Sequence, residues 1–234
     1  NIALFNNSPC ATLTIVAPLS NTSTFTNSGL FTVNTTQAHS NNAGFTNNGI
    51  LSYPQGNPIP NVTNNDLVAA PISGAAVIPN ALQKGGALSF TAAGAWYSDP
   101  LLTTLAGAYN QAANTFTPVN SLPQCANTLY FNVTDAVNGC TLVASIRVTY
   151  EVTAPMLTCP ANRTLNLNTS CQASLANYTS LATVSDNCTA VASIVRAQSP
   201  GTGNTVNGVG TTVVSITATD LVGNSASCVF NVTR

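Results

Sequence analysis

The sequence has 234 residues, enough for one large domain or for two to three small ones. Only 5% of the residues are charged and the net charge is −1, so no basic surface is available for phosphate groups, and nucleic-acid binding is excluded. Hydrophobic residues make up 44% of the chain, enough to bury a core, yet no apolar run approaches the roughly 18 residues of a membrane span, so no membrane insertion is expected.

The first 65 residues repeat one phrase at a fixed interval. Residues 5–14, 25–34 and 45–54 read FNNSPCATLT, FTNSGLFTVN and FTNNGILSYP. Such an interval is typical of short solenoid coils, in which each coil buries its apolar face only by stacking on the next. We therefore predict a solenoid-like or ladder-like β segment over residues 1–65, with sharp corners at NSG and NNG. A set of ordinary hairpins is the alternative.

Two sets of side chains would stack in this segment, one of Phe5, Phe25 and Phe45 and one of Asn7, Asn27 and Asn47. The phenylalanines would form an internal stack, and the side-chain amides of the asparagines can form a ladder between coils. Three coils are marginal alone. We expect the segment to pack on the next domain or on another copy of the chain.

Residues 66–153 contain a predicted hairpin. Apolar and polar side chains alternate in residues 128–135 and again in residues 140–152, as in half-buried strands. Residues 136–139, AVNG, tolerate positive φ and would form the turn. Trp96 is the only tryptophan, and we expect it to pack in a core rather than to stack on sugars from the surface.

A second hairpin closes the chain. The runs TTVVSITATD and SCVFNVT alternate in the same way and are joined by DLVGN. We expect Asp220 to accept backbone N–H groups across this turn and Gly223 to supply its left-handed residue. Asp135, in VTDAVNG, resembles Asp220, in ATDLVGN, and is predicted to cap its turn in the same way.

The last third of the chain resembles a known family. Its landmarks, in order, are Cys159-Pro160, Asp186-Asn187-Cys188, Gly210-Thr211-Thr212, and Thr219-Asp220 through Gly223-Asn224 to Cys228. Residues 154–234 thereby resemble the hyalin repeat, or HYR, domain, an immunoglobulin-like β-sandwich of many extracellular proteins. The resemblance implies the disulfides Cys159–Cys228 and Cys171–Cys188. Residues 66–153 resemble, less specifically, the tandem immunoglobulin-like repeats of bacterial adhesins.

The seven cysteines indicate disulfides in an oxidising compartment, because no C-x2-C pair occurs and the lone His39 lies in a polar stretch that offers no zinc site. Cys125 and Cys140 flank the first hairpin and are the favoured pair, provided that their Cα atoms come within about 7 Å. Cys10 would then be unpaired or linked to another chain. Alternatively, a Cys10–Cys125 bond would leave Cys140 alone and join the first two segments into one domain.

Catalytic chemistry is poorly supplied. No spaced carboxylate pair and no nucleophile–base–orienter set can be proposed, so we predict neither an enzyme nor a cofactor. Calcium needs six to eight oxygen ligands, whereas Asp135, Asp186 and Asp220 come from different loops. The sequence therefore predicts no metal site.

We expect an all-β chain of three parts: the β segment (1–65), an immunoglobulin-like β-sandwich (66–153) and an HYR-like β-sandwich (154–234). The favoured function is a non-catalytic, extracellular or cell-surface structural or adhesive module of a bacterial surface or matrix protein. One alternative is the repeating subunit of a self-assembling filament or sheath, which the low charge favours because copies repel little. A weaker alternative is a carbohydrate-binding module. Expected partners are other copies, flanking domains of a larger surface protein and possible glycans.

Overall fold

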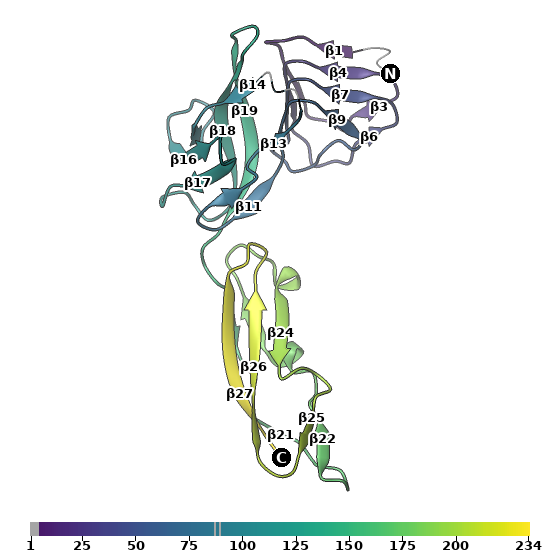
Figure 1. The fold of residues 1–234 in the computed structure, drawn as a ribbon, viewed down its shortest axis with the longest axis vertical. Helices are drawn as coiled ribbons and strands as arrows, with labels where there is room; N and C mark the ends of the chain where they lie inside the picture. Colours follow the sequence, from purple (N-terminus) through teal and green to yellow (C-terminus); the bar gives the residue numbers. More distant parts are fainter. Residues whose placement is uncertain (1–4, 87, 89) are drawn as a thin grey trace. The chain divides into compact units, whose positions relative to one another are not determined.

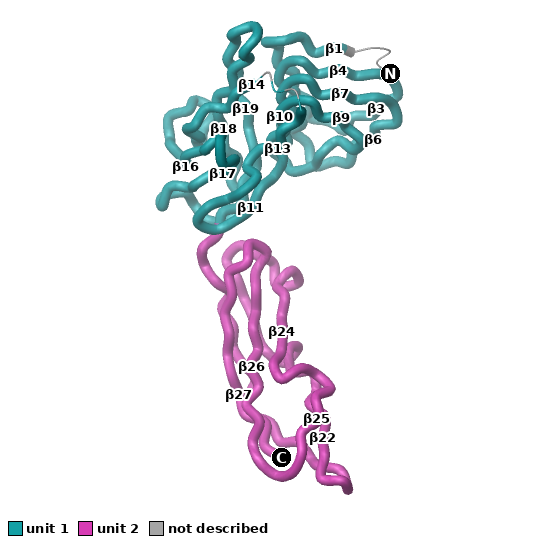
Figure 2. The backbone as a smooth tube through the Cα atoms, viewed as in Figure 1, with its two compact units in different colours: residues 1–150 teal, residues 151–234 magenta. Residues whose placement is uncertain are grey.

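The computed structural model describes residues 5–86, 88 and 90–234. The chain divides into two compact units, Asn1–Tyr150 and Glu151–Arg234 (Figure 2). Strands predominate, and the helices in the described ranges are the short 3₁₀ helices η1 (Thr179–Leu181) and η2 (Val191–Ser193), so the all-β prediction is confirmed. The boundary expected after residue 65 falls inside the first unit, whereas the one expected after residue 153 lies three residues from the observed division.

The chain begins as a stack of parallel coils, visible at the N-terminal end in Figure 1. One face is the sheet β1 (Phe5–Asn7), β4 (Phe25–Asn27), β7 (Phe45–Asn47) and β9 (Val62–Asn64). A second face consists of β2 (Thr12–Ile15), β5 (Leu30–Val33), β8 (Ile50–Ser52) and β10 (Leu67–Ala69), with β13 (Gln83–Lys84) antiparallel on β10. A third, short sheet pairs β3 (Ser20–Asn21) with β6 (Ser40–Asn41), which follow β2 and β5 along the chain. The solenoid prediction is therefore confirmed.

The repeat interval corresponds to one coil. Phe25 pairs with Phe45 in parallel register, and their rings lie 4.5 Å apart between centroids. Phe5 pairs with Phe25 along the backbone, whereas its side chain lies outside the described residues. The first coil has two additional residues before β2, so Thr12 pairs with Leu30 rather than with Thr32.

The amide ladder runs through the interior of the stack. The Nδ2 of Asn7 donates to Oδ1 of Asn27 at 2.7 Å, Asn27 donates to Asn47 at 2.7 Å, and Asn47 donates to Asn64 at 2.8 Å. Gly49 forms the corner beside it, where an added Cβ would lie 2.3 Å from the carbonyl oxygen of Gly29 in the preceding coil. Side chains that satisfy one another thus repeat along the coil axis, and the corners require glycine because the coils approach closely.

The rest of the first unit is one hydrogen-bonded sheet that curves around a core. In spatial order its strands are β11 (Ile72–Gly74), β19 (Thr141–Tyr150), β18 (Cys125–Asp135), β15 (Ala95–Tyr97), β16 (Leu105–Asn110), β17 (Thr115–Pro118) and β12 (Ile78–Pro79), and β14 (Phe90–Ala92) also pairs with β18. Trp96 is fully buried in this core, and its ring stacks at 4.5–5.1 Å from three others, those of Tyr109, Phe116 and Phe131. The predicted hairpin is the β18–β19 pair.

The solenoid packs on this sandwich. Such packing was expected, because three coils alone would be only marginally stable. Leu30, Ile50 and Leu67 belong to the same core cluster as Trp96 and the aromatic rings around it. The hydroxyl of Ser52 in β8 donates to the main-chain oxygen of Ser145 in β19, and both side chains are buried. The two segments therefore share one core, which explains why they form one compact unit.

The second unit is a smaller sandwich. One sheet consists of β21 (Arg163–Thr164), β27 (Ser225–Thr233), β26 (Thr211–Thr219) and β24 (Val195–Ser199). Two short pairs complete it: β20 (Met156–Thr158) with β23 (Thr183–Ser185), and β22 (Gln172–Ser174) with β25 (Thr205–Asn207). Its core contains the inward residues of the β26–β27 hairpin, among them Val214, Ile216 and Phe230.

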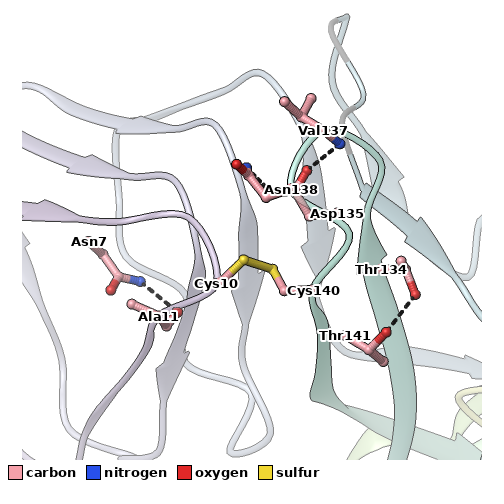
Figure 3. The surroundings of a disulfide bond; sticks show 9 residues. All are labelled: Asn7, Cys10, Ala11, Thr134, Asp135, Val137, Asn138, Cys140 and Thr141. Atoms are coloured by element: carbon pink, nitrogen blue, oxygen red, sulfur yellow. Dashed lines mark hydrogen bonds between the residues drawn. A yellow bond between two sulfur atoms is a disulfide. The ribbon is translucent and has the colours of Figure 1, made fainter.

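The disulfides correct two predictions. Cys10 is bonded to Cys140, with an S–S distance of 2.06 Å and a Cα–Cα distance of 5.6 Å (Figure 3). Cys10 is therefore not left over, and the favoured Cys125–Cys140 pair is wrong. Cys125 opposes Tyr150 at one end of a ladder of ten paired positions, whereas Cys140 lies in the turn beyond the other end. Ten strand residues span about 30 Å, far beyond the reach of a disulfide.

The second unit contains the Cys159–Cys228 bond that the resemblance implied, with an S–S distance of 2.03 Å. The implied Cys171–Cys188 bond is wrong, because Cys171 is a free, exposed thiol. Its main-chain oxygen accepts from Gly208, just before β26 begins, whereas Cys188 lies close in sequence to Asp186, which meets Asp220 just after β26 ends. The nine residues of β26 thus separate the two cysteines. Cys125 and Cys188 are each disulfide-bonded.

Candidate functional site

Three carboxylates meet at one end of the second unit. Glu151 is its first residue, Asp186 follows β23, and Asp220 follows β26. One oxygen from each carboxylate lies within 4.8 Å of the others. The strand ends therefore bring together acidic residues that are 34 or more positions apart in the sequence.

Asp186 and Asp220 are held in place by their own turns. Asp186 Oδ1 accepts the N–H groups of Cys188 at 2.9 Å and of Thr189 at 2.7 Å. Asp220 Oδ1 accepts three N–H groups, those of Val222, Gly223 and Asn224, at 2.7–3.0 Å. Hydrogen bonds from backbone N–H groups to Oδ1 thus fix both carboxylates, and the Oδ2 atoms accept none of these bonds.

Asn224 connects Asp220 to the start of the unit. Its Nδ2 donates to Asp220 Oδ2 at 2.8 Å and to the main-chain oxygen of Glu151 at 3.3 Å. Gly223, with φ of +101°, allows the turn that places Asn224 there. The turn-capping prediction for Asp220 and Gly223 thus describes half of what this turn does.

Glu151 has the least favourable surroundings of the three. Its side chain is fully buried, Oε2 accepts weakly from the Thr189 hydroxyl at 3.4 Å, and Oε1 has no hydrogen-bond partner. Asp186 Oδ2 is likewise buried without a partner. Burial, and then the nearby carboxylates of Asp186 and Asp220, raise the pKa of Glu151 to about 7.

The pKa of Asp186 is shifted in the opposite direction, below its ordinary value. Burial opposes its ionisation, but the N–H groups of Thr189 and Cys188 and the adjacent Glu151 hold its pKa below the ordinary value. In the described part of the chain, the groups that act on Glu151 are carboxylates and a hydroxyl, with no cation among them. The arrangement can therefore bind either a proton or an added cation between its oxygens.

The sequence predicted no metal site, because Asp135, Asp186 and Asp220 come from different loops. The structure brings Asp186 and Asp220 together, whereas Asp135 lies in the other unit. There it caps the β18–β19 turn: its Oδ1 accepts from Val137 N–H at 2.8 Å and its Oδ2 from Asn138 Nδ2 at 2.6 Å (Figure 3). Sequence reasoning missed Glu151 as a partner of these aspartates. Its signal was its place as the only Glu, directly after a long strand pattern.

Comparisons with known proteins bear on the second unit. Residues 150–234 match the family model of the HYR domain. A comparison with curated protein sequences finds no match. None of the helices in the described ranges is long and apolar enough to cross a membrane.

Solved structures resemble the chain only distantly. The fibronectin(III)-like modules of Clostridium thermocellum CbhA give a TM-score of 0.36 at 13% identity, covering 69% of this chain and 87% of that one. Drosophila N-cadherin EC1-4 gives 0.28 at 10% identity, with 75% of this chain and 52% of that one covered. The human desmocollin-1 ectodomain gives 0.24 at 10% identity, with 73% and 42% covered. The chain thus spans about half or less of the two cadherin-type structures.

Proposed function

We propose that the chain is a non-catalytic, extracellular structural or adhesive module of a bacterial surface or matrix protein, because residues 150–234 match the family model of the HYR domain. The HYR match carries the proposal, because domains of this kind occur in many extracellular proteins. Residues 154–234 also contain four cysteines, and the four-cysteine form is typical of large bacterial surface proteins.

The cysteines support this location. Six of the seven are disulfide-bonded. Structural disulfides persist in oxidising compartments and are rare in reducing ones. A chain that acts outside the cell also gains from the shared core of solenoid and sandwich, since a rigid body transmits force and presents a defined contact surface.

Surface labelling tests the proposal. Antibodies raised against the purified chain should bind intact cells of the source organism, and external protease should remove the signal. Labelling that requires permeabilised cells would contradict an extracellular role. For adhesion, beads coated with the chain should attach to cells or matrix more than albumin-coated beads do, and equal attachment would contradict the adhesive part.

A second candidate function is a subunit that assembles through its solenoid. Among the described strands, β1 and β2 end their sheets, whereas the opposite end of the second sheet is covered by antiparallel β13. Exposed strand edges are templates for pairing with another chain. With only 5% charged residues, copies repel little as they approach.

The edge of β2 allows a specific test. The carbonyls of Ala11 and Ile15 accept from β5 and the next residues, so by alternation the N–H of Thr14 faces away from the stack. If the chain assembles by edge pairing, electron microscopy should show rods for the wild type and single particles for Thr14→Pro. A monodisperse monomer at high concentration would remove this candidate.

The carbohydrate-binding alternative loses its main residue, because Trp96 is buried.

A further inference from the structure

The Glu151–Asp186–Asp220 cluster concentrates negative charge and leaves two of its carboxylate oxygens without a hydrogen-bond donor. With all three groups ionised, three negative charges converge within 4.8 Å. Two of their oxygens, Glu151 Oε1 and Asp186 Oδ2, are buried without any donor. A buried carboxylate oxygen without a partner is costly, and native structures rarely leave such groups unsatisfied.

The second observation that points to a ligand is the placement of Glu151. Its side chain is fully buried, although a glutamate at a strand end could extend into solvent. The Asn224 amide holds its main chain, and Thr189, itself buried, contacts Oε2, while Oε1 has no partner. A carboxylate oxygen of Glu151 lies within 4.8 Å of an oxygen of each aspartate. Contacts from the turns around Asp186 and Asp220 thus hold a carboxylate with an unpartnered oxygen beside two other carboxylates.

The donor set restricts the ligand. All the available atoms are oxygens, because Cys188 is disulfide-bonded and the cluster contains no histidine. Oxygen-only sites favour hard cations such as Ca²⁺ and Mg²⁺ over zinc or copper. Calcium accepts irregular sets of six to eight oxygens, including carboxylates in either mode, whereas Mg²⁺ demands near-ideal octahedral geometry and retains its waters.

We propose that Glu151, Asp186 and Asp220 form a Ca²⁺-binding site within the second unit. Glu151 Oε1 and Asp186 Oδ2 are the first ligands, because no hydrogen bond has to break for them to coordinate. Asp220 contributes charge and an oxygen beside them, and water completes the coordination. The ion would neutralise the converging charges and fix the end of the unit to its first residue.

Calcium titration of the intact chain tests the site. In chelator-treated buffer at pH 7.5, calorimetry should give one saturable site with a Kd of about 10⁻⁴–10⁻³ M, the range of extracellular calcium modules. Ten millimolar CaCl₂ should raise the Tm of the second unit by at least about 5 °C. The same concentration of MgCl₂ should raise it less. Absence of saturable Ca²⁺ binding up to 20 mM would overturn the proposal and leave a shared proton between Glu151 and Asp186 as the occupant.

Two variants separate calcium binding from folding. Glu151→Gln should abolish the Ca²⁺-induced Tm shift while leaving the Ca²⁺-free domain at least as stable, because a neutral amide can donate to Asp186. Asp186→Asn should keep the Oδ1 contacts with Cys188 and Thr189 and weaken Ca²⁺ binding at least tenfold. Asp135→Asn is the matched control, since Asp135 caps a similar turn outside the cluster, and it should retain full binding. Retained binding in both cluster variants would contradict the proposed ligands. The site can exist whether or not the chain acts in adhesion, so the two ideas fail independently.

Discussion

Cys10 and Cys140, 130 residues apart in the sequence, are joined by a disulfide that ties the first coil of the solenoid to the turn of the β18–β19 hairpin (Figure 3). The bond closes a loop that contains nearly the whole of the first unit. The solenoid, built of parallel strands, and the sandwich that contains the antiparallel β18–β19 hairpin are thereby connected covalently as well as through their shared core.

Removing this bond should destabilise the first unit. Loop-entropy arithmetic for so long a loop gives about 5 kcal/mol as an upper value, and measured effects are typically about 2–4 kcal/mol. We expect Cys10→Ser/Cys140→Ser to lower the free energy of unfolding by that amount in urea titrations. Cys171→Ser is the control and should have no effect, because Cys171 is free and exposed. Non-reduced peptide maps should contain a Cys10–Cys140 pair, and a Cys125–Cys140 pair would refute the assignment.

The amide ladder should be a strong point of the solenoid. Asn27 is fully buried, donates to Asn47 and to the main-chain oxygen of Ile50, and accepts from Asn7. Asn27→Ala leaves these partners buried and unsatisfied, so we expect a loss of about 2–4 kcal/mol in the free energy of unfolding. Asn48→Ala removes one exposed amide contact and should cost less than about 1 kcal/mol. Equal effects of the two substitutions would contradict the ladder's role.

Trp96 should report on the first unit alone. Its ring is fully buried between Tyr109, Phe116 and Phe131. We expect blue-shifted emission that iodide does not quench until the first unit unfolds. Trp96→Ala should cost about 3–5 kcal/mol in unfolding free energy. Emission near that of free tryptophan in the native protein would show that the core assignment is wrong.

Stability of the second unit without metal should depend on pH through Glu151. Its pKa is raised from 4.5 to about 7, so the folded state keeps the proton longer than the unfolded state does. The stability contributed by this group is fully present below pH 4.5 and is lost as the pH rises through about 7. Asp186, whose pKa is lowered, acts only at more acidic pH.

Calorimetry in EDTA between pH 5 and 8 measures this dependence. The transition of the second unit should move to lower temperature as the pH rises, and in Glu151→Gln it should stay nearly constant. Trp96 fluorescence identifies the transition of the first unit, where burial lowers the pKa of His39 and acid therefore destabilises. A wild-type transition that rises in temperature between pH 5 and 7 would contradict the assignment to Glu151.

The sequence by itself determined what repeats and what alternates. The recurring Phe and Asn positions required in-register coils, because parallel stacking places equivalent side chains one above another. The period-two runs required the two long hairpins, and the turn residues Asp135, Asp220 and Gly223 have local roles that depend only on their neighbours. The HYR landmarks belong to the same class, since they are local phrases in a fixed order.

Only the tertiary structure decided which distant residues meet. Cys125 and Cys140 flank a hairpin in the sequence, yet the length of its strands places them at opposite ends, while a coil more than a hundred residues earlier supplies the partner of Cys140. The place of Glu151 as the only Glu, directly after a long strand pattern, does not name its partners, because it acquires them only when two turns and a strand end converge. Disulfides and carboxylate clusters depend on through-space distances of a few ångströms, and strand length, register and packing set those distances, whereas local pattern sets only the strands themselves.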